Sequence, residues 1–144
     1  LVIHGSDAIL LERITYTRLT HLEVFGFISV DVMIRLIHRL PHLVSLHFSC
    51  LNLENVQTDF SIPECAEHEP MAPLDTQIRY LYLQQMEDQY ELPELALSML
   101  KYLLLRIPTL RSVTTELVPV EQTQAFIDEY VQWYPHLANI QLIE

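Results

Sequence analysis

The most constraining feature of this chain is a short motif that recurs three times: an apolar residue, proline, any residue and leucine. The copies occupy positions 40–43, 107–110 and 134–137. The third and fifth residues after each leucine are apolar or threonine. Side chains alternate across a β-strand, so residues two apart share one face. The motif therefore predicts a turn that leads into a short, half-buried strand.

Two further stretches have the same strand pattern without the proline, and they begin at Leu19 and Ile78. Successive copies start 24 to 35 residues apart. The first three residues of the chain are also apolar and fit the end of another strand. We therefore expect five or six short strands.

The residues before each proline predict three helices in a common register. Their apolar side chains have the spacing i, i+3, i+4, i+7, which places them on one helix face. Ser29 suits the N-cap of the first helix, and Pro93 and Pro119 suit the first turns of the others, where a missing N–H costs nothing. The apolar faces are Met33, Leu36, Ile37 and Leu40; Leu100, Leu103, Leu104 and Ile107; and Ile127, Tyr130, Val131 and Tyr134.

Alternating strands and helices predict an α/β fold with a parallel sheet and right-handed crossovers. A compact doubly wound α/β domain is one architecture of this kind. The other is a repeat array, because the unit resembles the leucine-rich-repeat family from about Leu19 to Leu142. It is most similar to the irregular repeat region of fungal F-box-like proteins.

The resemblance implies a leucine-rich-repeat solenoid arc, with a short parallel sheet of five or six strands and helices on the convex side. It also implies a non-enzymatic role in recognition, such as the substrate-receptor part of an F-box-type adaptor, although no F-box segment is visible. The chain departs from the family at the position three residues after the last apolar residue of each strand. Members of the family usually have Asn or Cys there, in a ladder of hydrogen bonds to the backbone, and packing must replace that ladder here. The residues at this position are Phe27, Leu51, Met86 and Val118.

The length of 144 residues fits one repeat domain over 1–144, which we interpret as a fragment of a longer chain. Half of the residues are hydrophobic, enough to build a core at this size. The stretch 54–76 interrupts the repeats, because it has six acidic residues and no Lys or Arg. We expect an acidic surface loop there.

The charge limits the partners. Eight basic residues face nineteen acidic ones, for a net charge of −11 with histidine neutral. Nucleic acids and anionic membranes are bound through clustered Lys and Arg, so we expect neither as a partner. A protein or peptide is expected, and a basic one fits the charge. Two cysteines, Cys50 and Cys65, and no visible targeting segment favour an intracellular chain, cytoplasmic or nuclear.

The outward face of the strands is the expected binding surface, because solenoids bind along their concave sheet. Alternation places Asn139 beside Ser112 in one lane of this face and Gln141 beside Thr114 in the next. Aromatic side chains among polar ones are typical of protein interfaces, although strand aromatics also pair with one another. The candidate partner-binding residues are His21, Glu23, Phe25, His47, Tyr80, Tyr82, Gln84 and Thr114.

The sequence has no catalytic motif, so we expect no catalytic residue and no cofactor. Cys65, Glu67 and His68 are close together, but no second ligand pair follows at zinc-finger spacing, so we expect no metal. His47 and Cys50 would point to opposite faces of one strand. Two alternatives stay open: a small doubly wound enzyme such as a hydrolase, and a structural fragment that self-associates through uncapped ends.

Overall fold

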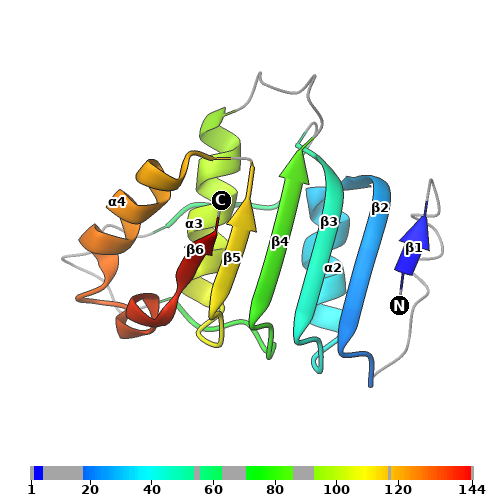
Figure 1. Cartoon of the computed structure of the whole chain (residues 1–144), viewed down its shortest axis with the longest axis horizontal. Helices are drawn as coiled ribbons and strands as arrows, with labels where there is room; N and C mark the ends of the chain where they lie inside the picture. Colours follow the sequence, from blue (N-terminus) through cyan, green and yellow to red (C-terminus); the bar gives the residue numbers. More distant parts are fainter. Residues whose placement is uncertain are drawn as a thin grey trace.

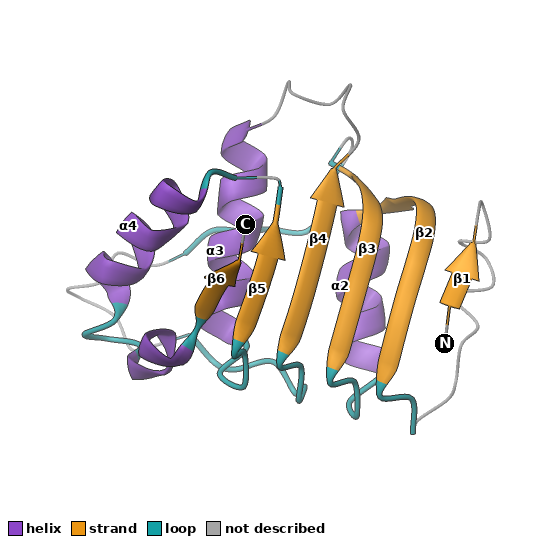
Figure 2. Ribbon diagram, viewed as in Figure 1, coloured by secondary structure: helices purple, strands orange, loops and turns teal. Residues whose placement is uncertain are grey.

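A computed structural model describes residues 2–4, 18–53, 56–62, 71–85, 93–116 and 118–143. They form strands, α-helices and a short 3-10 helix (Figure 2). The strands are β1 (Val2–His4), β2 (His21–Ser29), β3 (Ser45–Asn52), β4 (Tyr80–Gln85), β5 (Ser112–Thr115) and β6 (Gln141–Ile143). The helices are α2 (Val30–Arg39), α3 (Pro93–Arg106), α4 (Val120–Tyr130) and the 3-10 helix η1 (Pro135–Asn139).

The strands form one six-stranded parallel sheet whose order follows the chain from β1 to β6. In Figure 1, α2 and α3 lie behind the sheet, and α4 lies at its edge beside β6. Over the described residues, the prediction of an α/β fold with a parallel sheet of five or six strands and three α-helices is confirmed. A doubly wound sheet reverses its strand order at a switch point, and the described strands have no such reversal.

The core lies between the sheet and the helices. Leu22, Leu46 and Leu81 are direct neighbours across three strands, and each is almost fully buried. Burying one such side chain stabilises the fold by roughly 1.5–3 kcal/mol. The next row of the same face is Val24, Phe48, Leu83 and Thr115, all buried. The strand alternation read from the sequence therefore selects the buried face correctly.

Helices α2 and α4 both end before the proline of the motif that follows, α2 at Arg39 and α4 at Tyr130. A residue before proline disfavours the helical conformation, and Leu40 and Tyr134 have φ of −119° and −128° with ψ of 73° and 77°. Both turns then close with the same hydrogen bond. The N–H of Leu43 donates to the Leu40 carbonyl (3.1 Å), and that of Leu137 donates to the Tyr134 carbonyl (3.0 Å).

The helix ends agree with the sequence at α2 and differ at α4. The hydroxyl of Ser29 accepts the N–H of Val32 at 3.3 Å and caps α2, as expected. Pro119 is the N-cap of α4 and not a residue of its first turn. The apolar spacing predicted a helix as far as Tyr134, but α4 ends at Tyr130 and turns fill 131–133.

The last strand pairs two residues away from the predicted register, so the placements of Asn139 beside Ser112 and of Gln141 beside Thr114 were wrong. The cause is η1, in which the N–H of Ile140 donates to the Leu137 carbonyl (3.2 Å) and adds a turn before β6 begins. A shift of two keeps Leu142 on the inward face. The observed pairs are Ser112 with Gln141, Val113 with Leu142 and Thr114 with Ile143.

The crossover between β3 and β4 contains neither helix nor strand in its described parts, 56–62 and 71–79. This segment includes the stretch 54–76, for which we expected an acidic surface loop. Its described parts nevertheless bury several side chains against the core. These are Phe60, Leu74, Thr76 and Ile78.

Contacts with α3 hold this crossover in place. The ring of Phe60 packs edge-on against Tyr102, with ring centroids 5.2 Å apart. The N–H of Leu74 donates to the carbonyl of Arg106, the last residue of α3, at 2.8 Å. The guanidinium of Arg106 donates in turn to the carbonyl of Ala72 at 3.0 Å. The described crossover residues therefore extend the core across the helix layer.

The start of α2 holds the other end of the crossover. The carboxylate of Asp31 accepts the backbone N–H groups of Gln57 and Thr58, each at 2.9 Å, and also the Thr58 hydroxyl. Partial burial raises the pKa of Asp31, but these hydrogen bonds and the charge of Arg35 outweigh it, so the pKa lies below its ordinary value. Asp31 is thus a structural carboxylate.

Candidate functional site

The outward face of the sheet is the face turned toward the viewer in Figure 1, opposite α2 and α3. No described helix covers it. Neighbouring strands align its side chains in two lanes. The first lane is His21, Ser45, Tyr80, Ser112 and Gln141, and the second is Glu23, His47, Tyr82, Thr114 and Ile143.

Three rings form a cluster on this face, which we call the aromatic cluster: Phe25, His47 and Tyr82. The rings of His47 and Tyr82 meet edge to face, with centroids 4.3 Å apart. Phe25 approaches the other side of His47 in the same way, at 5.5 Å. Edge-to-face geometry is the favoured arrangement of aromatic rings. The structure therefore brings three of the predicted site residues into direct contact.

The central ring has an unpaired polar atom. The Nε2 atom of His47 is buried and has no hydrogen-bond partner among the described residues. This nitrogen donates a hydrogen bond in one tautomer of the neutral ring and accepts one in the other. Among the described residues it does neither. A buried polar atom without a partner costs about 1–3 kcal/mol, so this nitrogen lowers the stability of the fold.

Polar groups border the aromatic cluster on two sides. The side-chain amide of Gln84 donates to the Tyr82 hydroxyl at 2.9 Å and reaches the carboxylate of Glu116 at 3.4 Å. Glu23 pairs directly with His47 in the sheet, and its side chain is exposed. The aromatic cluster therefore lies between two exposed carboxylates.

A β-bulge sets the position of Phe25. The pairing of β2 with β3 shifts after Val24, so Phe25 and Gly26 lie opposite Ser49 alone. Gly26 has a φ of 132°, which only glycine adopts readily. Its N–H donates to the Ser49 hydroxyl, and that hydroxyl donates to the Val24 carbonyl, both at 3.3 Å. Ser49 thus satisfies the backbone groups that the bulge leaves open.

The remaining predicted residues lie beside the aromatic cluster. Tyr80 is half exposed, at 51%, between Ser45 and Ser112. His21 is exposed at the start of β2, and Thr114 is partly buried next to Tyr82. These three widen the candidate surface without contributing to the ring contacts.

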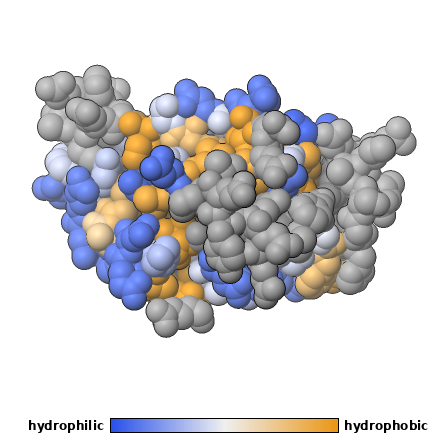
Figure 3. Space-filling view, turned by 90° about the horizontal axis from the view of Figure 1, so that it is seen from above, coloured by the Kyte–Doolittle hydropathy of each residue, from blue (hydrophilic) through white to orange (hydrophobic). Residues whose placement is uncertain are grey.

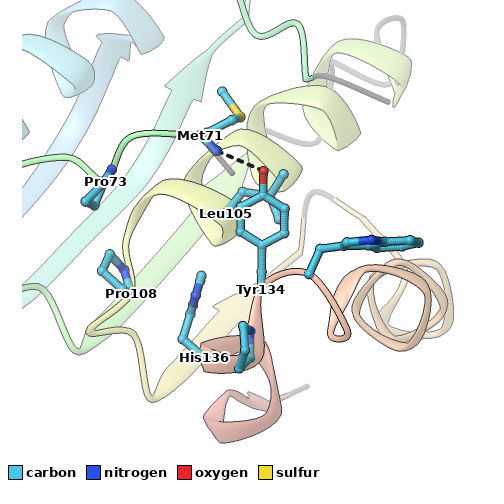
Figure 4. Close-up of a pocket in the computed structure, with 8 residues that line it drawn as sticks. Met71, Pro73, Leu105, Pro108, Tyr134 and His136 are labelled. Atoms are coloured by element: carbon cyan, nitrogen blue, oxygen red, sulfur yellow. Dashed lines mark hydrogen bonds between the residues drawn. The ribbon is translucent and has the colours of Figure 1, made fainter. Parts of the chain in front are cut away.

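A second feature, which the sequence did not predict, is a cavity of about 270 Å³ between α3 and η1 (Figure 4). Tyr134 lies at its centre, and its hydroxyl accepts the N–H of Met71 at 3.0 Å. The ring of His136 is fixed by a hydrogen bond from its Nε2 to the Leu104 carbonyl, at 2.7 Å. The lining is Met71, Pro73, Leu105, Pro108, Trp133, Tyr134, Pro135 and His136.

The view of the molecule from above, at the end where the strands finish, shows hydrophobic residues between hydrophilic ones (Figure 3). Among the described helices, none has both the length and the apolar character of a membrane span. The described residues hold no group of three His, Cys, Asp or Glu side chains that could bind a metal ion. Cys65, Glu67 and His68 lie outside the described residues, as does the side chain of Cys50.

Comparisons of the chain with models of protein families, with curated proteins and with solved structures found no match. The candidate site therefore has to be judged from its own geometry.

Proposed function

We propose that this chain forms a leucine-rich-repeat-like solenoid arc whose outward sheet face binds a protein or peptide and catalyses no reaction. The observation that carries the proposal is the aromatic cluster on a sheet face that no described helix covers. Aromatic side chains supply much of the binding energy in protein interfaces. Sequential parallel strands, with two helices on one face, support the arc.

The charge of the surface favours a basic partner. Glu23 and Glu116 are exposed on either side of the aromatic cluster, and the described strands contain no Lys or Arg. A Lys or Arg of the partner can lie against the ring of Tyr82 and pair with Glu116. A substrate-receptor role in an F-box-type adaptor, and an intracellular location, belong to the same proposal through the resemblance of the repeats.

The test starts with capture of a partner from cells, followed by titration of that purified partner in a calorimeter. Truncation of one ring of a binding centre typically costs more than 1 kcal/mol, so Tyr82→Ala and Phe25→Ala should each weaken binding by about fivefold or more. Trp133→Ala is the matched control, because Trp133 is a partly exposed aromatic residue of the chain away from this face. Circular dichroism checks that each variant is folded.

Two outcomes separate the alternatives. Binding that is unchanged in Tyr82→Ala and Phe25→Ala contradicts the proposal. Light scattering that shows self-association, with no partner captured, favours the structural fragment. An enzyme of the doubly wound type needs a polar cleft at the carboxyl ends of the strands, and the cavity beside η1 lies elsewhere.

A further inference from the structure

A second hollow lies where β2, β3 and β4 begin, at the amino-terminal ends of the strands. Its volume is about 360 Å³. Three separate segments build it: the residues before β2, the proline turn before β3 and the end of the crossover before β4. The lining residues are Arg18, Thr20, His42, Val44 and Gln77.

The lining is rich in hydrogen-bond donors. Arg18, His42 and Gln77 contribute a guanidinium, an imidazole and an amide, and none of the lining side chains is a carboxylate. None of these three side chains has a hydrogen bond or ion pair with another described residue. The hydroxyl of Thr20 lies 2.8 Å from Nδ1 of His21 and is already engaged.

The neighbouring edge of the sheet adds positive charge. The N–H of Arg79 donates to the carbonyl of Val44, a lining residue, at 2.8 Å, so the backbone of Arg79, just before β4, lies beside the hollow. Arg111 follows in the same way, because its N–H donates to the Arg79 carbonyl at 2.9 Å. Both arginines are exposed. Arg18, Arg79 and Arg111, three of the eight basic residues of an acidic chain, therefore lie just before strands at the same end of the sheet.

We propose that this hollow binds a phosphate group. Arg18, His42 and Gln77 bring potential donors from three segments to one hollow, and arginine is the preferred side chain for phosphate. The volume exceeds that of a phosphate ion, so the site also has room for the group that carries it. The proposal is independent of binding at the aromatic cluster, which lies on the outward face.

The first experiment titrates the isotope-labelled chain with inorganic phosphate at constant ionic strength and follows the backbone amide resonances. We expect saturable shifts at Arg18, Thr20, His42 and Gln77, and little change at Tyr82. Arg18→Gln should weaken binding about tenfold, the effect of one charge-assisted hydrogen bond. Arg35→Gln is the control, because it removes the same charge from the exposed side of α2.

A second variant, Gln77→Glu, places a carboxylate in the hollow and should abolish the shifts. Both positions are exposed, and circular dichroism confirms that the variants fold. Shifts that do not saturate, or titrations of Arg18→Gln that match the wild-type chain, overturn the proposal. A phosphoserine peptide that binds more tightly than inorganic phosphate, when its serine form does not bind, identifies the source as a modified protein. Equal or weaker binding of that peptide identifies a free phosphate compound.

Discussion

Replacing His47 by phenylalanine should stabilise the protein. The ring of His47 lies between Phe25 and Tyr82, and its Nε2 atom is buried without a partner. Phenylalanine keeps a ring in the same place and removes the polar atom. The edge-to-face contacts at 5.5 and 4.3 Å can therefore persist, while the cost of the unpaired nitrogen disappears.

The size of the effect follows from two opposing contributions. An unpaired buried polar atom costs about 1–3 kcal/mol, and the lower end applies because His47 as a whole is only partly buried. Phenylalanine is larger, and overpacking a closed core costs about 1–3 kcal/mol. Here no described helix covers the ring, so the extra volume can point outward and the cost is small. The expected net gain is about 1 kcal/mol, a rise in Tm of about 2–4 °C for a chain of this size.

Urea unfolding followed by circular dichroism measures this gain, with the slope of the transition expected to stay constant. His21→Phe is the matched control, because His21 is an exposed histidine of the same face. Its effect should stay within about 0.5 kcal/mol. A loss of stability in His47→Phe, or a gain equal to that of His21→Phe, would refute the reasoning, since the buried nitrogen would then cost nothing.

Two further substitutions test other parts of the structure by the same assay. Gly26→Ala should lower the free energy of unfolding by about 2 kcal/mol, because a φ of 132° is open only to glycine. The control is Ser45→Ala, in a regularly paired part of β3, which should change the free energy of unfolding by less than about 0.5 kcal/mol. Equal effects of the two substitutions would contradict the bulge geometry. Asp31→Ala should cost about 1 kcal/mol at pH 7, because it removes the acceptor for Gln57 and Thr58. The folded pKa of Asp31 is lowered, so its contribution is complete above the unfolded pKa of about 3.9 and is lost as the pH falls through the folded pKa. The difference between wild type and Asp31→Ala should therefore shrink below about pH 4, and a difference that stays constant would exclude the carboxylate as its origin. Glu94→Ala, also an acidic residue in the first turn of a helix, here α3, should cost less at every pH.

Much of the fold could be predicted because its signals are local. The alternation around Leu46 and Phe48 identifies a buried strand face, and Ser29 marks the start of a helix by its capping hydroxyl. Pro41 and Pro108 mark the ends of α2 and α3 closely, because a proline restricts the residue before it, whereas α4 ends earlier than Pro135 indicates. Each of these features depends on only a few neighbouring residues.

The register of β6 could not be predicted because two alignments bury equivalent residues. Ile140 and Leu142 are both apolar and two residues apart, so a shift of two preserves the inward face. Only the extra turn of η1, which its hydrogen bonds reveal, selects the observed pairing. Sequence alternation therefore determines which face is buried, but it does not determine the stagger of a short strand.

The candidate site shows the same limit. Alternation places Phe25, His47 and Tyr82 on the outward face, but it says nothing about which ring edges meet or which nitrogen loses its partner. The bulge at Gly26 also escapes the pattern, because one glycine in a strand has several structural explanations. The crossover was predicted only as a loop, since the burial of Phe60 depends on α3, which lies far along the chain.

Stability and recognition are assigned to opposite faces of the sheet, and this separation makes the proposed function testable. Loss of a buried side chain such as Phe48 should reduce stability and binding together, because the fold itself is weakened. His47→Phe should instead raise stability while it alters the polar centre of the binding face. If binding falls in that variant, the decrease cannot be attributed to unfolding. Residues kept for function commonly reduce stability, and among the described residues of this face the buried nitrogen of His47 shows such a cost.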